Sequence, residues 1–156
     1  MNIPDVNTNH ADRARILVID DDEGMGYTLT RMAEEEGHAA RAAVTLIAGL
    51  EMVQGGGFDV VFLDVRLPDG SGIDAIPRIQ AAPNSPEIII ITGYGDKDGA
   101  KTALKSGVWD YIEKPARIDT MKLSLQRALQ YRSQKKALKS PAAIDRSGID
   151  SVNLAV

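Results

Sequence analysis

The chain contains no cysteine, and only 4% of its 156 residues are aromatic. Without cysteine it can form neither disulfides nor thiolate metal sites, and this composition fits a reducing compartment. Because rings are scarce while 44% of the residues are hydrophobic, the core must be built from aliphatic side chains. A chain of this length predicts one globular domain that buries about two thirds of its unfolded surface.

The chain also lacks a long apolar run and an excess of positive charge. No apolar stretch reaches the ~20 residues of a membrane span, and residues 1–14 are polar without a signal-peptide core. The net charge of −4 gives no general attraction to nucleic acid or to anionic membranes. We therefore expect a soluble cytoplasmic protein with no direct nucleic-acid partner and no membrane partner.

One group of basic residues lies near the end of the last predicted helix. We interpret it as a solvated helix end rather than a DNA contact, because the helix dipole favours cations there. The group comprises Arg127, Arg132, Lys135, Lys136 and Lys139.

Short apolar runs alternate with helical patterns along the chain. The runs predict strands over residues 15–19, 39–42, 58–63, 88–91 and 111–112. Strands that alternate with helices are typical of parallel βαβ units, not of a sandwich or a bundle. The sequence therefore predicts an α/β fold of five such repeats, a doubly wound five-stranded parallel sheet.

The boundaries of the first three helices follow from glycine and proline. The first helix ends at Gly37, a residue suited to a left-handed cap, and the second covers 45–53 before a run of three glycines. The segment 67–72 is predicted to be a turn, in which Asp69 and Gly70 have no further role. The start of the third helix stays open, because Pro77 is tolerated only in a first helical turn.

The last two helices differ in their apolar faces. The helix over 96–106 contains Gly99 and has only Ala100, Ala103 and Leu104 as an apolar face, so we expect it to pack lightly and to move. The last helix begins near Ile118 and continues through residue 138. Its core-facing residues are Met121, Leu125, Ala128 and Leu129.

Polar residues stand where four of these strands end. Because parallel strands bring their carboxyl ends to one crevice of the sheet, these side chains should converge. They are Asp20, Asp21 and Asp22 after the first strand, Asp64 after the third, Thr92 after the fourth and Lys114 after the fifth.

Three converging carboxylates need a cation, because each close pair repels by ~4 kcal/mol at an effective dielectric of 20. Oxygen ligands select Mg²⁺, or Mn²⁺, over zinc. With the ion and Lys114 in place, a carboxylate could attack a phosphoryl group and form an aspartyl phosphate, which makes Asp64 the natural acceptor. Thr92 could hydrogen-bond an oxygen of the attached group. Asp22 is assigned to capping the following helix instead.

Four motifs together resemble the receiver domain of a two-component response regulator, from about residue 15 to residue 138. They are Ile-Asp-Asp-Asp at 19–22, Leu-Asp-Val-Arg-Leu-Pro-Asp-Gly at 63–70, Ile-Thr-Gly at 91–93 and Tyr-Ile-Glu-Lys-Pro at 111–115. The resemblance implies the flavodoxin-like receiver fold with strand order 2-1-3-4-5. It also implies a phospho-accepting signalling switch whose only enzymatic activities are its own phosphorylation and dephosphorylation.

The resemblance implies a role for each site residue. Asp21 would hold Mg²⁺ directly and Asp20 through water, with Asp64 and the backbone carbonyl of Arg66 as further ligands. Asp64 would receive the phosphoryl group from a histidine kinase. Lys114 would contact the phosphoryl oxygens, next to a cis bond that precedes Pro115.

The same resemblance implies a conformational switch. Thr92 would move toward the phosphate and Tyr111 would turn inward, which remodels the face made by the fourth helix, the fifth strand and the fifth helix. The residues two past the acceptor and two past the threonine, Arg66 and Tyr94, modulate phosphoryl lifetime in the family. Because an Arg and an aromatic ring can shield an acyl phosphate from water, we expect slow self-dephosphorylation.

The sequence divides into a flexible segment at 1–14, a receiver domain at 15–132 and a linker helix end with a tail at 133–156. The last part resembles the linker before an AAA+ ATPase module in enhancer-binding transcription activators. We therefore expect a fragment of a transcription regulator, whose AAA+ or DNA-binding output domain is absent, over a stand-alone regulator. The continuing helix also predicts a homodimer through the fourth and fifth helices.

Three other functions compete. A haloacid-dehalogenase-like phosphohydrolase fits Asp20-x-Asp22, but Gly24 and the missing acidic pair after Lys114 depart from its pattern. A flavodoxin-type flavin binder shares the architecture, yet three acids would repel its phosphate. A receiver that binds proteins without phosphorylation would normally lack the acceptor or a metal ligand.

Overall fold

The computed structural model describes residues 13–93 and 97–139 and contains one five-stranded parallel sheet. Its strands are β1 (Arg15–Ile19), β2 (Ala39–Ala43), β3 (Val60–Leu63), β6 (Glu87–Thr92) and β7 (Asp110–Glu113). They lie in the order β2-β1-β3-β6-β7, and every neighbouring pair is parallel. The remaining two strands, β4 (Arg66–Leu67) and β5 (Gly70–Ser71), form a separate antiparallel hairpin. The order of the five parallel strands along the sheet confirms the predicted 2-1-3-4-5 topology.

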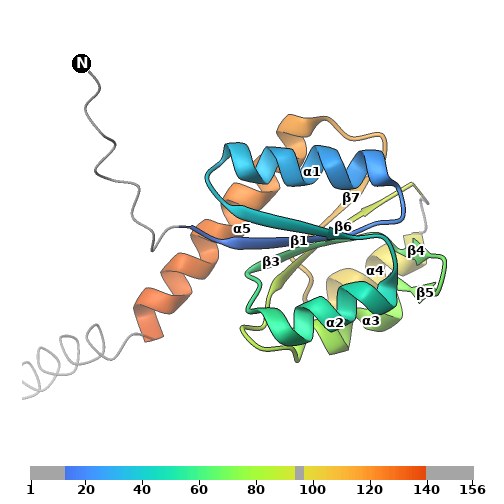
Figure 1. Cartoon of the computed structure of the whole chain (residues 1–156). Coiled ribbons are helices and arrows are strands. Elements are labelled where there is room, and N and C mark those ends of the chain that lie inside the picture. Colours follow the sequence, from blue (N-terminus) through green and yellow to red (C-terminus); the bar gives the residue numbers. More distant parts are fainter. Residues whose placement is uncertain (1–12, 94–96, 140–156) are drawn as a thin grey trace, which may run out of the picture.

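In the described part of the chain, five helices cover the two faces of the sheet (Figure 1). They are α1 (Glu23–Glu35), α2 (Leu46–Gly56), α3 (Gly72–Gln80), α4 (Lys97–Lys105) and α5 (Ile118–Lys139). Helices α1 and α5 pack on one face, and α2, α3 and α4 pack on the other. None of the helices described is long and apolar enough to cross a membrane.

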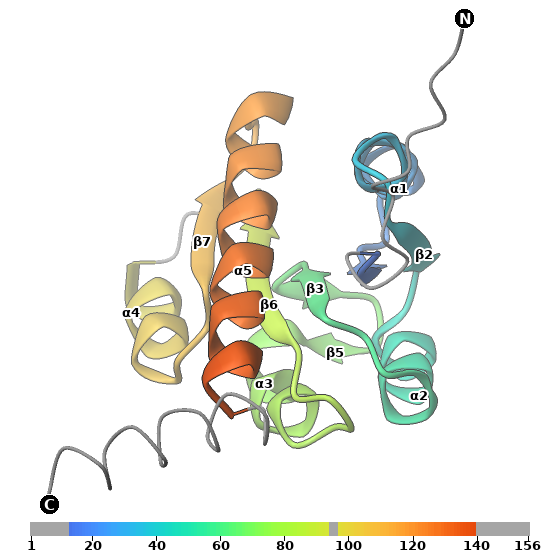
Figure 2. The ribbon, with the colours of Figure 1, turned by 90° about the vertical axis from the view of Figure 1, so that its left-hand side faces the viewer.

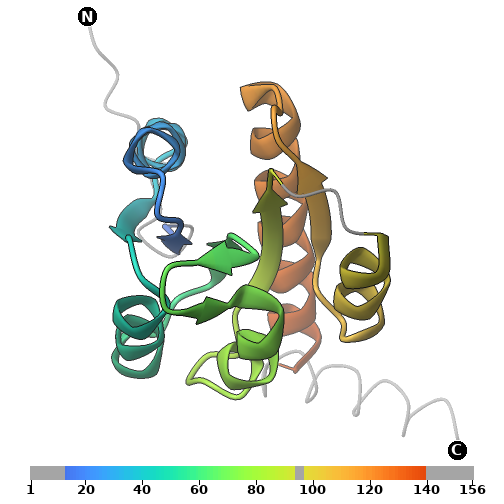
Figure 3. The same cartoon turned by 90° about the vertical axis from the view of Figure 1, so that its right-hand side faces the viewer.

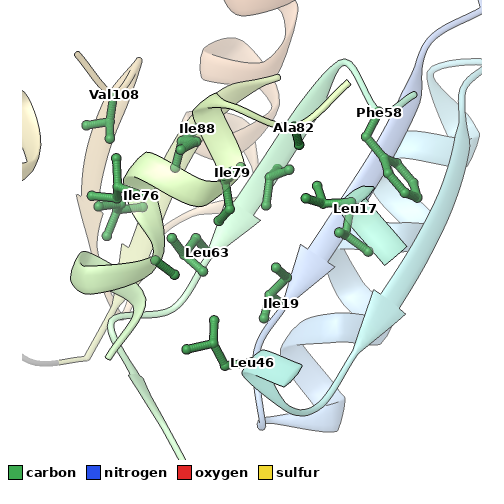
Figure 4. Packing of buried hydrophobic residues seen from close by; sticks show 14 of the residues in the cluster. Leu17, Ile19, Leu46, Phe58, Leu63, Ile76, Ile79, Ala82, Ile88 and Val108 are labelled. Carbon is green, nitrogen blue, oxygen red and sulfur yellow. The ribbon is translucent and has the colours of Figure 1, made fainter. Parts of the chain in front are cut away.

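The alternation of side chains along the central strands builds two cores. In β1, Leu17 and Ile19 join the cluster under α2, α3 and α4, while Ile16 and Val18 join the cluster under α1 and α5. Figure 4 shows the first of these clusters. Strands that are buried on both faces need continuous apolar runs, which is why the central strands were recognisable in the sequence.

Caps set the ends of the first two helices. The Asp22 carboxylate accepts the Met25 N–H at 3.2 Å, which confirms Asp22 as a capping residue. Gly37, with φ of 92°, has the predicted left-handed conformation. Helix α2 is longer than predicted: it continues to Gly56, and the left-handed residue that ends it is Gly57, with φ of 65°.

Helix α3 begins five residues before Pro77, so the expectation that this proline must lie in a first turn is wrong. The Ser71 hydroxyl caps the helix by accepting the Asp74 N–H at 3.5 Å. Proline inside a helix removes one backbone hydrogen bond. The burial of Ile76 and Ile79 in the core on either side of it offsets that cost.

Two residues of the last two helices differ from the predictions in their exposure to solvent. In α4, Ala103 is fully buried, but Leu104 is 54% exposed and does not belong to the core. In α5, Arg132 is buried instead of solvated. Its guanidinium donates to the carbonyls of Asn84 and Ser85, at 2.8 Å each, and to the Glu87 carboxylate at 2.9 Å. Arg132 thereby fastens α5, which lies beside β6 (Figure 2), to the amino end of that strand.

Candidate functional site

The candidate site lies at the carboxyl ends of the parallel strands, at the right of Figure 1 and facing the viewer in Figure 3. Backbone hydrogen bonds continue the sheet past the strand ends and fix the site residues there. Asp64 N–H donates to the Ile19 carbonyl at 2.9 Å, and Lys114 N–H donates to the Thr92 carbonyl at 2.7 Å. Residues that are far apart in the sequence therefore meet at one edge, as predicted.

Three carboxylates converge at this edge. Asp20, Asp21 and Asp64 each offer an oxygen, and these atoms lie within 4.8 Å of one another. Asp20 and Asp64 are buried, while Asp21 is exposed and opens the cluster to solvent. The donors are all oxygens, so the set fits a hard cation such as Mg²⁺.

Among the residues that the structure describes, Lys114 provides the positive charge in contact with the buried acids. Its Nζ lies 2.8 Å from Asp20 Oδ2 and 3.6 Å from Asp64 Oδ2. Burial raises the pKa of Asp20, against the hydrogen bonds from Lys114 and from the Asp22 N–H. Burial acts to lower the pKa of Lys114, but its bond to Asp20 and the nearby carboxylate charges outweigh that effect and raise it. Lys114 therefore stays charged, and the Lys114–Pro115 bond beside it is cis.

The two residues predicted as the switch pair lie on neighbouring strands. Thr92 ends β6 and is fully buried. Tyr111 pairs in register with Ile90 of β6 and packs, partly buried, against the cluster under α2, α3 and α4. Arg66 is the first residue of β4, two residues past Asp64. Tyr94 lies outside the described residues.

The sequence of this chain matches the model of the response regulator receiver domain over residues 16–126. The regulatory protein AtoC of Escherichia coli is 33% identical over 131 residues, which cover 80% of this chain and 27% of AtoC. This chain thus corresponds to a minor part of that regulator.

Solved structures agree with the sequence match. A solution structure described as the beryllofluoride-activated NtrC4 receiver domain dimer is 34% identical, with a TM-score of 0.70, and the match covers 75% of this chain and 97% of that one. A response regulator from Burkholderia pseudomallei, solved with a phosphorylated aspartic acid, a calcium ion and citrate, is 30% identical, with a TM-score of 0.68, over 82% of this chain and 75% of that one.

This chain belongs to the response regulator receiver domain family. It is thus a signalling module of two-component systems, related to AtoC and to the transcriptional regulatory protein ZraR of Klebsiella oxytoca, which is 34% identical over 130 residues, or 82% of this chain and 29% of ZraR. The haloacid-dehalogenase and flavodoxin interpretations of the sequence are wrong, because a receiver domain accounts for the same residues in the same order.

One glycine of this receiver domain was missed in the sequence. A Cβ on Gly72 would lie 2.1 Å from the Asp64 backbone oxygen, and the Gly72 N–H donates to the Val65 carbonyl at 2.7 Å. Any side chain at position 72 would therefore displace the backbone of the candidate acceptor. The sequence signal for it is weak, because Gly72 follows other glycine and turn residues and falls within the predicted turn at 67–72.

The prediction that Asp69 belongs to a simple turn was incomplete. Its carboxylate accepts the N–H groups of Leu46 and Ile47, each at 2.8 Å, and so caps α2 from a distant loop of the receiver domain. Both bonds lower the pKa of Asp69, and the bond from the Ile47 N–H has the larger effect. The local sequence carries no sign of this contact, since its partners lie more than twenty residues earlier.

Proposed function

We propose that this receiver domain accepts a phosphoryl group on Asp64 from a sensor histidine kinase, with Mg²⁺, and thereby controls a transcriptional output. The observation that carries the proposal is that carboxylate oxygens of Asp20, Asp21 and Asp64 lie within 4.8 Å of one another. The Lys114 ammonium forms ion pairs with the two buried acids of this cluster, Asp20 and Asp64. Carboxylates, a hard cation and an ammonium are the groups that an in-line phosphoryl transfer to a carboxylate requires.

The contacts of Asp64 favour one of its oxygens as the nucleophile. Oδ1 accepts the Val65 N–H at 2.7 Å, whereas Oδ2 faces Lys114 at 3.6 Å. Oδ2 would attack the phosphorus of the kinase's phosphohistidine, so that an O–P bond forms while the N–P bond breaks. The imidazole nitrogen keeps the electron pair of the broken bond and takes a proton from solvent. Lys114 would then donate to a phosphoryl oxygen and offset its charge.

The acidic cluster is the proposed Mg²⁺ site, and Mn²⁺ would also fit. Asp21 would bind the ion directly and Asp20 through water, while Asp64 and the Arg66 backbone carbonyl would complete the protein ligands. When bound, the ion would neutralise charge on the transferred group. The all-oxygen donor set and the solvent-open position of Asp21 support this assignment.

The switch would run through Thr92 and Tyr111 to the face formed by α4, β7 and α5. Thr92 would bond to the phosphoryl group and Tyr111 would turn inward. Helix α4 can respond because Leu104 contributes little to its packing, being 54% exposed. A homodimer through this face is part of the proposal, and the similar NtrC4 receiver is described as a dimer.

The proposed organisation is a segment at 1–14, the receiver at 15–132 and a linker at 133–156 in a cytoplasmic regulator. The continuation of α5 to Lys139 supports a helical start of the linker. The similarity to the transcriptional regulatory protein ZraR, of which the match covers 29%, supports a transcriptional output. The proposed output domain is of the AAA+ or DNA-binding kind. Slow dephosphorylation through Arg66 and Tyr94 remains a prediction.

Intact mass spectrometry after incubation with acetyl phosphate, with and without Mg²⁺, tests the proposal. We expect the wild-type chain to gain one phosphoryl group only with Mg²⁺, and Asp64→Ala to gain none. Circular dichroism on both proteins controls for folding. A folded wild type that gains nothing would instead support a receiver that binds its partners without phosphorylation, and a gain that persists in Asp64→Ala would place the acceptor elsewhere.

A further inference from the structure

The loop that follows Asp64 is a closed hairpin. Strands β4 and β5 pair Arg66 with Ser71 and Leu67 with Gly70. The Gly72 N–H closes the base of the hairpin on the Val65 carbonyl at 2.7 Å. The backbone at Arg66, which the proposed function makes a metal ligand, therefore moves only if the hairpin moves.

Asp69 ties the tip of this hairpin to another element. Asp69 Oδ1 accepts the Leu46 N–H and Oδ2 accepts the Ile47 N–H, each at 2.8 Å, so both carboxylate oxygens bind the first turn of α2. Two charge-assisted bonds from one planar group fix orientation as well as distance. The partial positive charge of the helix N-terminus adds to the attraction.

The tie is reinforced by close packing at the next residue. A Cβ on Gly70 would lie 3.0 Å from the Leu46 side chain, so the hairpin backbone rests against α2. Leu46 is itself buried in the core under α2, α3 and α4. Figure 3 shows the green hairpin beside the teal helix α2 at the carboxyl edge of the sheet. The hairpin is thus held by a helix that is anchored in the core.

Helix α2 does not depend on Asp69 for all of its capping. The Thr45 hydroxyl accepts the Ala48 N–H at 3.1 Å, as an ordinary local N-cap. Asp69 satisfies two further N–H groups of the same turn. The two residues therefore both stabilise the start of α2, but Asp69 is the one that also connects it to the hairpin.

We propose that Asp69 is a positioning residue for the metal site, which holds the β4–β5 hairpin on α2 and so fixes the Arg66 carbonyl relative to Asp64 and the acidic cluster. This inference rests on the proposed function, because it needs Mg²⁺ to bind at that cluster. Loss of the tie would let the hairpin tip leave α2 and would weaken metal binding without removing a ligand.

Isothermal titration calorimetry with Mg²⁺ alone, on the full chain, tests this proposal. We expect Asp69→Ala to weaken Mg²⁺ binding by about tenfold, as loss of a group that orients a metal ligand does. Asp69→Asn keeps one acceptor oxygen and should fall between Asp69→Ala and the wild type. Thr45→Ala is the matched control, since it removes an α2 cap but leaves the hairpin tie, and it should retain wild-type affinity.

Kinetics provide a second readout that a purely structural role would not produce. In acetyl phosphate reactions, Asp69→Ala should raise the Mg²⁺ concentration for half-maximal rate and leave the rate at saturating Mg²⁺ near that of the wild type. Thermal melts of both variants report the shared loss of α2 capping.

The outcomes separate the two proposals. If Asp69→Ala melts earlier, like Thr45→Ala, yet both bind Mg²⁺ as the wild type does, Asp69 is only a helix cap and the inference is overturned. If the folded wild type itself does not bind Mg²⁺, both the proposed function and this inference are wrong. If Asp69→Ala does not fold, Asp69→Asn decides the question. A Mg²⁺ affinity below that of the wild type supports the inference, and an unchanged affinity overturns it.

Discussion

Lys114 and Asp20 form the shortest ion pair at the candidate site, with 2.8 Å between Nζ and Oδ2, and the same ammonium reaches Asp64 at 3.6 Å. One ammonium thus forms ion pairs with two buried carboxylates, which directly follow the neighbouring strands β1 and β3. Among the described residues, no other cation lies within 4 Å of either acid, so removing Lys114 links the stability of the fold to the chemistry of the site.

Lys114→Met should therefore destabilise the metal-free protein by about 2 kcal/mol, because buried carboxylates lose their partner. Added Mg²⁺ should restore more stability to the variant than to the wild type, since the ion would replace the lost charge. Urea unfolding with and without Mg²⁺ measures both effects. Lys101→Met, at an exposed position on α4, is the control and should change little. Equal responses of the two variants would contradict this prediction.

Gly72 should tolerate no side chain. Gly72→Ala would place a Cβ 2.1 Å from the Asp64 backbone oxygen, so the backbone must shift, at a cost of about 2 to 3 kcal/mol. The variant should also accept phosphoryl groups from acetyl phosphate more slowly, because Asp64 would be displaced. Urea unfolding and intact mass spectrometry measure the two effects.

Gly55 is the matched control for this substitution. A Cβ on Gly55, inside α2, meets nothing within 4 Å, and alanine is the better helix former there. Gly55→Ala should thus stabilise the protein by about 0.5 to 1 kcal/mol. A Gly72→Ala protein as stable as the wild type would show that the loop has more room than the structure indicates.

Arg132 should contribute far more to the free energy of unfolding than Lys136, which lies one helical turn further along α5. Arg132→Met leaves the Asp59 and Glu87 carboxylates at the amino ends of β3 and β6 without their buried cation, which should cost about 3 kcal/mol. The side chain of Lys136 is 64% exposed and lies 3.6 Å from Asp59, so Lys136→Met should cost at most about 0.5 kcal/mol. Chemical denaturation of the two variants tests the difference, and similar losses would contradict the assignment of Arg132 to the structural base of α5.

The sequence was sufficient wherever structure depends on local pattern. The apolar runs of the central strands, the acids at their ends and the cap at Asp22 are each set by a few adjacent residues. The convergence of Asp20, Asp64 and Lys114 then followed from one rule, since parallel strands present their carboxyl ends at the same edge. The fold and the convergence of these three side chains were predictable for that reason.

The errors concern contacts between distant segments. The prediction of a solvated Arg132 was wrong because its partners, Asp59 and Glu87, are more than forty residues away in the chain. The prediction of a simple turn at Asp69 was incomplete because the N–H groups that its carboxylate accepts belong to α2, a distant segment. The start of α3 could not be predicted from the local cost of Pro77 alone, since the buried neighbours Ile76 and Ile79 keep that proline inside the helix.

The pH dependence of stability should contain a contribution from His38. Burial lowers its pKa from the ordinary value of 6.5, helped by Arg13 and opposed by the charges of Glu36 and Asp59. Its Nδ1 also accepts the Ala14 N–H at 3.1 Å, a bond that protonation of that nitrogen removes. Below pH 6.5 the unfolded chain therefore binds more protons at His38 than the folded chain does. This contribution to stability is complete above that pH and is lost as the pH falls.

His38→Asn tests this contribution, because an amide oxygen can still accept the Ala14 N–H but does not titrate. Urea unfolding of both proteins from about pH 7.5 to about pH 5.5 spans the ordinary histidine pKa. The wild type should lose more stability across this range than the variant, and the difference should develop below the ordinary pKa, not above it. Parallel losses in the two proteins would mean that His38 is equally protonated in the folded and unfolded chains. The fall in stability would then have to come from other groups, and the bond to Ala14 would not depend on the charge of the ring.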